Sequence, residues 1–141
     1  MMNKRDGATL TILRYDPAKS ADPHYETYDV KATKDTTVLD ALFQILETQD
    51  HSLTFRYSCR SAVCGSCAMF INGRHKLACS TLISEIGRDV IIQPLPHMPI
   101  IRDLVVDLTT FFEKYKVIKP DVVLIKTPPQ SEWIQSPRQR S

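Results

Sequence analysis

Cysteine is the residue type in this sequence with the clearest capacity for chemistry. The four cysteines, Cys59, Cys64, Cys67 and Cys79, lie in one short stretch, and no cysteine occurs elsewhere among the 141 residues. Their spacing is C-x4-C-x2-C, followed by a fourth cysteine after eleven intervening residues. Thiolates are soft ligands that bind transition metals. The clustering therefore predicts one metal-binding site, made by a tight loop and a returning segment.

The spacing favours a 2Fe-2S cluster, because plant-type clusters are held by the same C-x4-C-x2-C arrangement with a fourth cysteine later in the chain. We therefore predict that all four thiolates bind the cluster and that the chain has no catalytic residue. Backbone N–H groups and serine hydroxyls of the loop could donate hydrogen bonds to sulfur and tune the reduction potential. The residues around the cysteines are small enough for the backbone to wrap closely around an inorganic core: Ser58, Ser61, Ala62, Gly65, Ser66 and Ala68. Nearby basic residues would favour the more negative, reduced cluster: Arg56, Arg60, Arg74 and Lys76.

Zinc, disulfides or free thiols are the alternative uses of these cysteines. Structural zinc prefers two C-x2-C pairs or pairs of cysteine and histidine, and this sequence has a single C-x2-C. Disulfides need an oxidising compartment, and nothing in the sequence indicates export. His75 lies between the third and fourth cysteines, where we expect a solvated turn residue rather than a ligand.

Length and composition exclude several other classes of protein. With 141 residues, 43% of them hydrophobic and 24% charged, the sequence is that of one globular domain with its own core. No uncharged apolar run approaches the roughly 20 residues of a membrane-spanning helix. The formal net charge of +2 is too small for a surface that follows nucleic-acid phosphates. No Ser-His-Asp pattern and no phosphate-binding glycine loop is evident, so we expect no bond chemistry by this chain alone.

Hydrophobic periodicity and turn residues predict the elements that hold the cysteine loop. Residues 8–15 and 25–32 alternate as strands, and 68–72, 74–78 and 89–95 are further strands. Between them, a threonine and an aspartate at 37 and 40 predict the start of a helix that runs to about residue 48. This order is that of an α+β, β-grasp ferredoxin-like domain. The predicted core consists of Leu10, Ile12, Val30, Leu39, Leu42, Leu46, Ile91 and Ile92.

The last third of the sequence departs from this pattern. Prolines precede a predicted amphipathic helix at 102–117, whose apolar face holds Leu104, Val105, Leu108, Phe111, Phe112 and Tyr115. We expect this face to pack on the sheet, and contact with another chain is the alternative. Four prolines after residue 119 predict an extended linker or a partner-binding tail, with Trp133 as a candidate anchor. The predicted division is therefore a ferredoxin-type domain at 1–100, a packing helix at 101–119 and a tail at 120–141.

The sequence closely resembles the N-terminal half of the iron-sulfur subunit of succinate dehydrogenase and fumarate reductase, respiratory complex II. The resemblance covers essentially residues 8–141 and is carried by two stretches, SCRSAVCGSCAMFINGRHKLAC and VIIQPLPHMPIIRDLVVDLTTFFEKYKVIKP. Small iron-sulfur subunits of molybdenum hydroxylases can have similar cysteine spacing, but they continue into a helical domain with four more cysteines. Some complex II subunits have aspartate as the third ligand, a position that Cys67 occupies here.

The resemblance implies an electron-transfer subunit that is not catalytic alone. In complex II an FAD-bearing flavoprotein oxidises succinate, and electrons pass singly through the 2Fe-2S cluster to a four-iron and a three-iron cluster and then to quinone. Fumarate reduction uses the reverse route. The implied location is the cytoplasmic face of a bacterial inner membrane or the matrix side of the mitochondrial inner membrane, peripheral and held through membrane-anchor subunits.

The domain that binds the two further clusters is missing from this sequence. The implied partner is therefore a separate chain that carries it, and a piece of a longer chain is the alternative. The initial methionine favours the separate chain. Two other functions remain open for the same cluster: a 2Fe-2S subunit of another flavin-dependent reductase, or a free electron carrier.

Overall fold

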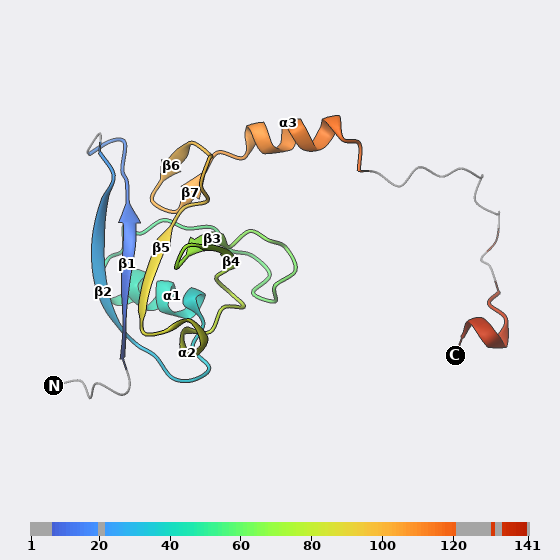
Figure 1. The fold of residues 1–141 in the computed structure, drawn as a ribbon, viewed down its shortest axis with the longest axis horizontal. Helices are drawn as coiled ribbons and strands as arrows, with labels where there is room; N and C mark the ends of the chain where they lie inside the picture. Colours follow the sequence, from blue (N-terminus) through green and yellow to red (C-terminus); the bar gives the residue numbers. More distant parts are fainter. Residues whose placement is uncertain (1–6, 20–21, 121–130, 132–133, 141) are drawn as a thin grey trace. The chain divides into compact units, whose positions relative to one another are not determined.

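The first strand sets the frame of the sheet. β1 (Gly7–Arg14) alternates strictly between buried and partly exposed residues, as expected for a strand with one face against a core. It pairs antiparallel with β2 (His24–Lys31) and parallel with β5 (Asp89–Gln93). On the other side of β5, β3 (Ala68–Ile71) pairs antiparallel with both β5 and β4 (Arg74–Leu77). The result is a five-stranded mixed sheet in the order β2-β1-β5-β3-β4 (Figure 1).

Two compact units make up this computed structural model, Met1–Leu108 and Thr109–Ser141. The structure describes residues 7–19, 22–120, 131 and 134–140. The sheet, the cysteine loop and all of the buried core belong to the first unit.

Helix α1 (Val38–Thr48) lies against one face of the sheet (Figure 1). Its first turn has the predicted capping box: Thr37 Oγ1 accepts a hydrogen bond from the Asp40 N–H at 3.1 Å, and the Asp40 carboxylate accepts one from the Thr37 N–H at 3.0 Å. The buried face of the helix joins the inward-facing residues of the strands in one hydrophobic core. This face consists of Val38, Leu39, Ala41, Leu42 and Ile45.

Most of the predicted core is confirmed. Leu46 is only partly buried, although it packs against the core. Ile91 is wrong, because it is 49% exposed. β5 alternates between faces, so Val90 and Ile92 point into the core and the residue between them points away. The predicted core residues that are buried are Leu10, Ile12, Val30, Leu39, Leu42 and Ile92.

A two-residue turn joins β3 to β4 and fixes their register. Asn72 and Gly73 both have positive φ, at 47° and 76°, as a type I′ hairpin turn requires. The Asn72 side chain accepts a hydrogen bond from the Ile91 N–H at 2.7 Å, which ties the turn to β5. The turn thereby places the start of β3 opposite the end of β4, with Ala68 across from Leu77.

The predicted helix at 102–117 is wrong in its first half. Residues 100–106 form a small hairpin of β6 (Ile100–Arg102) and β7 (Val105–Val106), and the helix α3 covers only Thr109–Val117. Of the residues on the predicted apolar face in this stretch, Leu104 is buried in the core but Val105 is only partly buried, and the buried residue of β7 is Val106, which lay outside that face. Asp103 has a φ of 45°, so the chain turns there instead of continuing as a helix. A short helix that the periodicity did not predict, α2 (Ile83–Ile86), precedes β5.

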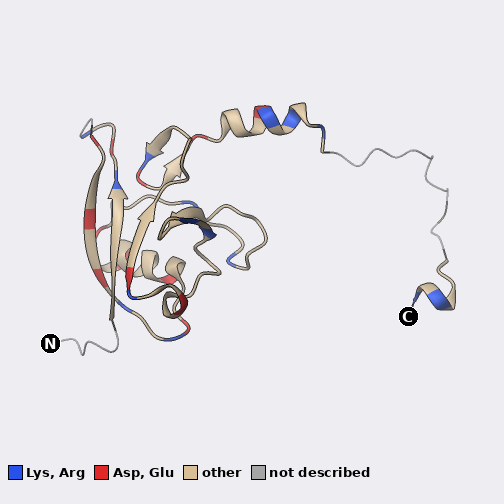
Figure 2. Ribbon diagram, in the orientation of Figure 1, with Lys and Arg blue, Asp and Glu red and all other residues tan. Residues whose placement is uncertain are grey.

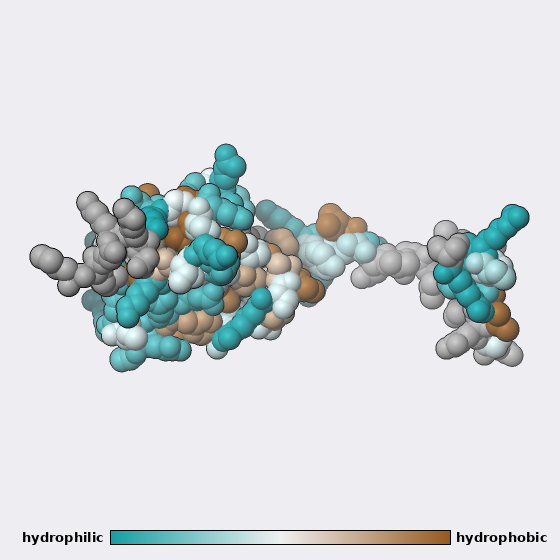
Figure 3. Space-filling model, turned by 90° about the horizontal axis from the view of Figure 1, so that it is seen from below, coloured by the Kyte–Doolittle hydropathy of each residue, from teal (hydrophilic) through white to brown (hydrophobic). Residues whose placement is uncertain are grey.

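The second unit contains α3 and a short 3-10 helix, η1 (Pro137–Gln139). No residue of α3 is buried, and Phe111 and Phe112 are each about half exposed. Figure 2 shows basic residues toward the end of α3, and Figure 3 shows hydrophobic side chains on the surface of this unit. Packing of the helix on the sheet stays a prediction, as does the division at residues 100 and 119. Trp133 lies outside the described residues.

No helix in the described parts of the chain combines the length and the apolar character that crossing a membrane requires.

Candidate functional site

Three of the four cysteines lie on an exposed loop between the end of α1 and β3. Cys59 and Cys64 are exposed, whereas Cys67, at the entry to β3, is buried. The loop curls tightly because Arg60, Ala62 and Gly65 all have positive φ, between 56° and 73°. Gly65 adopts such a backbone easily, but the other two residues do so at a cost. Two of these three positions therefore carry the small residues expected in this loop, Ala62 and Gly65, and the third carries Arg60.

Cys59 and Cys64 form one pair of thiols. Cys59 Sγ accepts hydrogen bonds from the N–H groups of Ser61, Val63 and Cys64, at 3.3, 3.4 and 3.3 Å. Cys64 Sγ accepts from the N–H groups of Cys59 and Ser66, at 3.5 and 3.4 Å. Hydrogen bonds from the Ser66 side chain and from the Cys59 and Ser66 backbone lower the pKa of Cys64 to about 6. Donors aimed at sulfur stabilise its negative charge, so this half of the loop favours thiolate.

Cys67 and Cys79 form the second pair. They adjoin the paired ends of β3 and β4, and the Cys79 N–H donates to Cys67 Sγ at 3.4 Å. The Ala78 N–H also donates to the Cys67 carbonyl at 3.0 Å. Burial raises the pKa of the Cys67 thiol; the Cys79 N–H opposes this effect, and the Cys79 thiol adds to it. The hairpin register thus brings together two cysteines that are separated by eleven residues.

The start of α1 holds the segment that carries Cys79. The N–H groups of Val38 and Leu39 donate to the carbonyls of Thr81 and Ala78, at 2.9 and 3.0 Å. The first N–H groups of a helix have no partner within the helix, so these bonds satisfy them. The helix is therefore a direct support of the fourth cysteine.

The arrangement in two pairs fits a two-iron group better than a single metal ion. Each iron of a 2Fe-2S cluster with four cysteine ligands takes two thiolates, whereas a structural zinc ion collects four ligands around one centre. Hydrogen bonds to sulfur from backbone N–H groups are also typical of iron-sulfur sites. His75 is exposed on β4, with its ring edge-on to Phe70 at 5.1 Å.

An aromatic cluster of Phe43, Phe55 and Tyr57 lies beside the loop, and sequence reasoning missed it. Phe43 on α1 meets Phe55 and Tyr57 edge-on, with ring centroids 5.4 and 4.8 Å apart. Arg60 extends over two of these rings, its guanidinium carbon 4.7 Å from the Phe43 centroid and 5.4 Å from that of Tyr57. The alternate placement of the aromatic residues at 55 and 57, just before Cys59, is the signal that could have predicted it.

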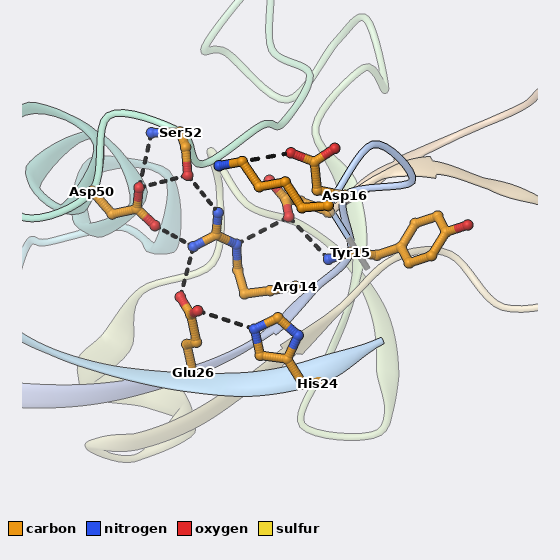
Figure 4. A pocket seen from close by; sticks show the side chains of 9 residues that line it. Arg14, Tyr15, Asp16, His24, Glu26, Asp50 and Ser52 are labelled. Carbon is orange, nitrogen blue, oxygen red and sulfur yellow. Dashed lines mark hydrogen bonds and ion pairs between the residues drawn. The ribbon is translucent and has the colours of Figure 1, made fainter. Parts of the chain in front are cut away.

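A second polar site, the Arg14 cluster, lies at the end of β1 (Figure 4). The Arg14 side chain is 8% exposed and donates through Nε to Asp103 at 3.0 Å and through Nη1 to Glu26 at 2.8 Å. It also donates to Asp50, and through Nη2 to Ser52 at 2.9 Å. The Arg14 cluster consists of Arg14, Glu26, Tyr28, Asp50, Ser52 and Asp103.

Asp103 connects the rest of the Arg14 cluster to the segment that leads from α1 to Cys59. Its carboxylate accepts from the Tyr15 N–H at 3.0 Å and from the Thr54 N–H at 2.9 Å, in addition to Arg14. The turn between β6 and β7 is thereby attached both to the end of β1 and to the segment that runs toward Cys59. A hollow of about 130 Å³ lies beside these residues.

The charges of the Arg14 cluster stabilise one another. Burial works against the charges of Arg14 and Asp50, but hydrogen bonds to Asp103 and Asp50 raise the pKa of Arg14, and those from Ser52 and Arg14 lower the pKa of Asp50. A hydrogen bond from Tyr28 lowers the pKa of Glu26. Burial and its carboxylate acceptors raise the pKa of Tyr28. An arginine at an inward-facing position of an alternating strand is the sequence signal that could have indicated this cluster.

Most of the chain is similar in sequence to iron-sulfur subunits of two respiratory enzymes. The chain is 45% identical over 138 residues to the succinate dehydrogenase iron-sulfur subunit of Paracoccus denitrificans, a match that covers 94% of this chain and 53% of that protein. It is 44% identical over 114 residues to the fumarate reductase iron-sulfur subunit of Haemophilus influenzae, covering 81% of this chain and 44% of that protein. The chain thus spans about half the length of the curated relatives it matches.

A solved structure and a family model agree with these relatives. A chain of the Mycobacterium smegmatis Sdh1 complex in the apo form superposes with a TM-score of 0.77 at 31% identity, covering 94% of this chain and 55% of that one. This likeness confirms the predicted α+β ferredoxin-like fold. The family model for the 2Fe-2S iron-sulfur cluster binding domain matches residues 9–113, which include all four cysteines. The predicted cofactor is thereby confirmed, and the chain belongs to the 2Fe-2S iron-sulfur cluster binding domain family.

Proposed function

We propose that this chain is the electron-transfer part of a succinate dehydrogenase or fumarate reductase complex. It relays electrons between the FAD of a flavoprotein subunit and further iron-sulfur clusters, and from there to or from quinone. The observation that carries the proposal is the meeting of four thiols in two pairs, in a chain similar to such iron-sulfur subunits over most of its length. In this proposal, residues outside this sequence hold the further clusters, because its four cysteines are all used by the 2Fe-2S cluster.

Four thiolates hold the 2Fe-2S cluster in this proposal. One iron takes Cys59 and Cys64, and the other takes Cys67 and Cys79, because these are the thiols that lie next to each other. The bound cluster would supply one-electron transfer.

The chain's own residues hold the cluster and determine which of its sides is buried and which is exposed. N–H groups of the loop direct hydrogen bonds to the Cys59 and Cys64 sulfurs, which favours negative charge there and so favours the reduced state. Cys67 and the core residues behind it exclude water on the inner side. The outer side consists of exposed residues 57–66, where a redox partner can approach.

Purification from the native source under mild conditions tests the assignment to a complex. We expect the chain to copurify with a flavoprotein that carries FAD and with succinate or fumarate activity in the complex. The isolated chain should contain about two irons and two labile sulfides and give an EPR signal only when reduced by one electron.

Two other results would redirect the proposal. A chain with its two irons but no flavoprotein partner would indicate a free electron carrier, and a flavoprotein inactive with succinate and fumarate would indicate another flavin-dependent reductase. Zinc in place of iron and sulfide would overturn the electron-transfer role itself.

A further inference from the structure

Arg60 occupies an unusual position in the cysteine loop. It directly follows Cys59, its φ of 56° is in the left-handed region, and its side chain lies across Phe43 and Tyr57. A residue with a Cβ is strained in this region unless its surroundings hold it there. Among the described residues, Arg60 is the cation that lies over these rings, and it forms no ion pair with a carboxylate. Arg60 is exposed, so its guanidinium lies against aromatic faces on one side and faces solvent on the other.

The rings under Arg60 are fixed by the core. Phe43 extends from α1, and both Phe43 and Phe55 pack against the buried hydrophobic residues. Tyr57 is 47% exposed, but its ring is held edge-on to Phe43. A guanidinium on these rings consequently connects an exposed loop to a rigid helix. Cation–π contacts of this kind are favourable, and more so where water is partly excluded.

The backbone that Arg60 fixes is the part that supplies hydrogen bonds to sulfur. The N–H groups of Ser61, Val63 and Cys64 all point at Cys59 Sγ, at 3.3 to 3.4 Å. Three N–H groups from a four-residue stretch converge on one atom only if the chain curls, and the positive φ of Arg60 and of Ala62 produces that curl. The Ser61 hydroxyl donates to the Cys59 carbonyl at 3.1 Å, a contact that stays within the curl, whereas Arg60 reaches from the curl to Phe43 on α1.

We propose that Arg60 is a positioning residue: its guanidinium, seated on Phe43 and Tyr57, locks the turn that directs three N–H groups onto Cys59 Sγ. The inference rests on the proposed function, because its consequence is a cluster that is held more firmly and reduced more easily. It differs from a simple charge effect, in which the positive charge of Arg60 acts on the cluster directly. In the positioning role, removing the aromatic ring has the same consequence as removing the arginine.

Variants of the full chain loaded with its cluster distinguish the two roles. Arg60→Gln removes the cation, Phe43→Leu removes a ring but keeps the cation, and Tyr57→Leu removes the exposed ring without touching the core. Arg56→Gln is the matched control, because it removes the same charge from the same segment, outside the aromatic contacts. The measurements are the rate of cluster loss to an iron chelator and the midpoint potential from an EPR-monitored redox titration.

We expect Arg60→Gln and each ring variant to lose the cluster about three- to tenfold faster than the unmodified chain. All three should lower the midpoint potential, because hydrogen bonds to sulfur favour the reduced form. The Arg60→Gln/Phe43→Leu double variant should lose the cluster no faster than the faster of the two single variants, because both changes remove the same contact. Arg56→Gln should change the rate less than twofold.

The proposal is overturned if both ring variants keep the rate and potential of the unmodified chain, whether or not Arg60→Gln shifts the potential. If Arg56→Gln and Arg60→Gln shift the midpoint potential equally and the ring variants do not shift it, the shift is due to charge alone and the proposal is overturned. An unmodified chain that takes up no 2Fe-2S cluster would instead overturn the proposed function, and this inference with it. The behaviour of the unmodified chain therefore separates the two failures.

Discussion

The cysteine loop and the Arg14 cluster are both polar sites built from distant segments, but they satisfy their polar groups in opposite ways. In the Arg14 cluster one buried guanidinium meets three carboxylates, and these accept further hydrogen bonds from Tyr15, Tyr28 and Thr54. In the cysteine loop the sulfurs accept hydrogen bonds from backbone N–H groups at 3.3 to 3.5 Å, joined at Cys64 by the Ser66 side chain, and two of the four thiols are exposed.

The difference indicates which site can bind something. A cluster whose charges are paired internally has little capacity left for a ligand, so we assign no ligand to the hollow beside Arg14. Thiols that accept weak hydrogen bonds and face solvent keep their capacity for metal. One site therefore stabilises the fold, and the other gives the fold its function.

The strongest test of this contrast is to remove one loop thiol. Cys64→Ala should abolish the native 2Fe-2S cluster, because one iron loses a ligand, while the unfolding free energy of the metal-free chain changes little at this exposed position. EPR of the reduced protein and urea unfolding measure the two effects. Ser61→Ala, in the same loop, is the control and should keep the signal. An unchanged EPR signal in Cys64→Ala would remove Cys64 from the ligand set.

The opposite pattern is expected for the Arg14 cluster. Asp103→Ala leaves Arg14 Nε and the N–H groups of Tyr15 and Thr54 without an acceptor, and should lower the unfolding free energy by about 3–5 kcal/mol. Asp103→Asn keeps one acceptor oxygen and should cost less. Urea unfolding of the metal-free chain measures both, with Glu47→Ala on the exposed side of α1 as a control within about 0.5 kcal/mol. Equal stability of Asp103→Ala and the unmodified chain would show that the network does not support the fold.

Acid should reduce the contribution of the Arg14 cluster to the unfolding free energy, by less than the loss of Asp103. The pKa values of Asp50 and Glu26 lie below their ordinary values in the folded chain, so their stabilising contribution is complete above about pH 4–5. It is lost as the pH falls through the folded-state pKa values, and we expect a loss of about 1–2 kcal/mol below pH 4 after screening. Urea midpoints at a series of pH values measure it. Asp50→Asn should be less stable at neutral pH and show a shallower acid dependence, and an identical slope would contradict the role of this carboxylate.

The smallest effect concerns hydrogen bonding in the cysteine loop. Ser66→Ala removes a side-chain hydrogen bond to Cys64, and should lower the midpoint potential by about 20–60 mV, the one-electron equivalent of about 0.5–1.5 kcal/mol. Ser58→Ala, next to Cys59, should leave the potential unchanged. A redox titration decides, and equal shifts in the two variants would mean that the hydroxyl of Ser66 does not act on the sulfur.

Much of the fold was predictable because local patterns and tertiary structure agree. The strict alternation in β1, the capping box at Thr37 and the Asn72-Gly73 turn are each local features with one strongly preferred structure. The prediction of a helix at 102–117 was wrong in its first half because the local pattern and the tertiary structure disagree there. Its first half is apolar at helical spacing, but Asp103 turns back to bind Arg14, Tyr15 and Thr54, which lie far away in the sequence.

The sequence by itself determined the type of chemistry, since four cysteines at C-x4-C-x2-C with a later fourth indicate a 2Fe-2S cluster, and the family model agrees. Only the tertiary structure decided which thiols lie together, because the hairpin register brings Cys79 to Cys67 and the curled loop brings Cys64 to Cys59. It also placed Arg60 on Phe43 and Arg14 among its carboxylates. The physical reason is that ligand type follows from residue identity, whereas contacts between residues far apart in the chain depend on how strands, helix and loops pack together.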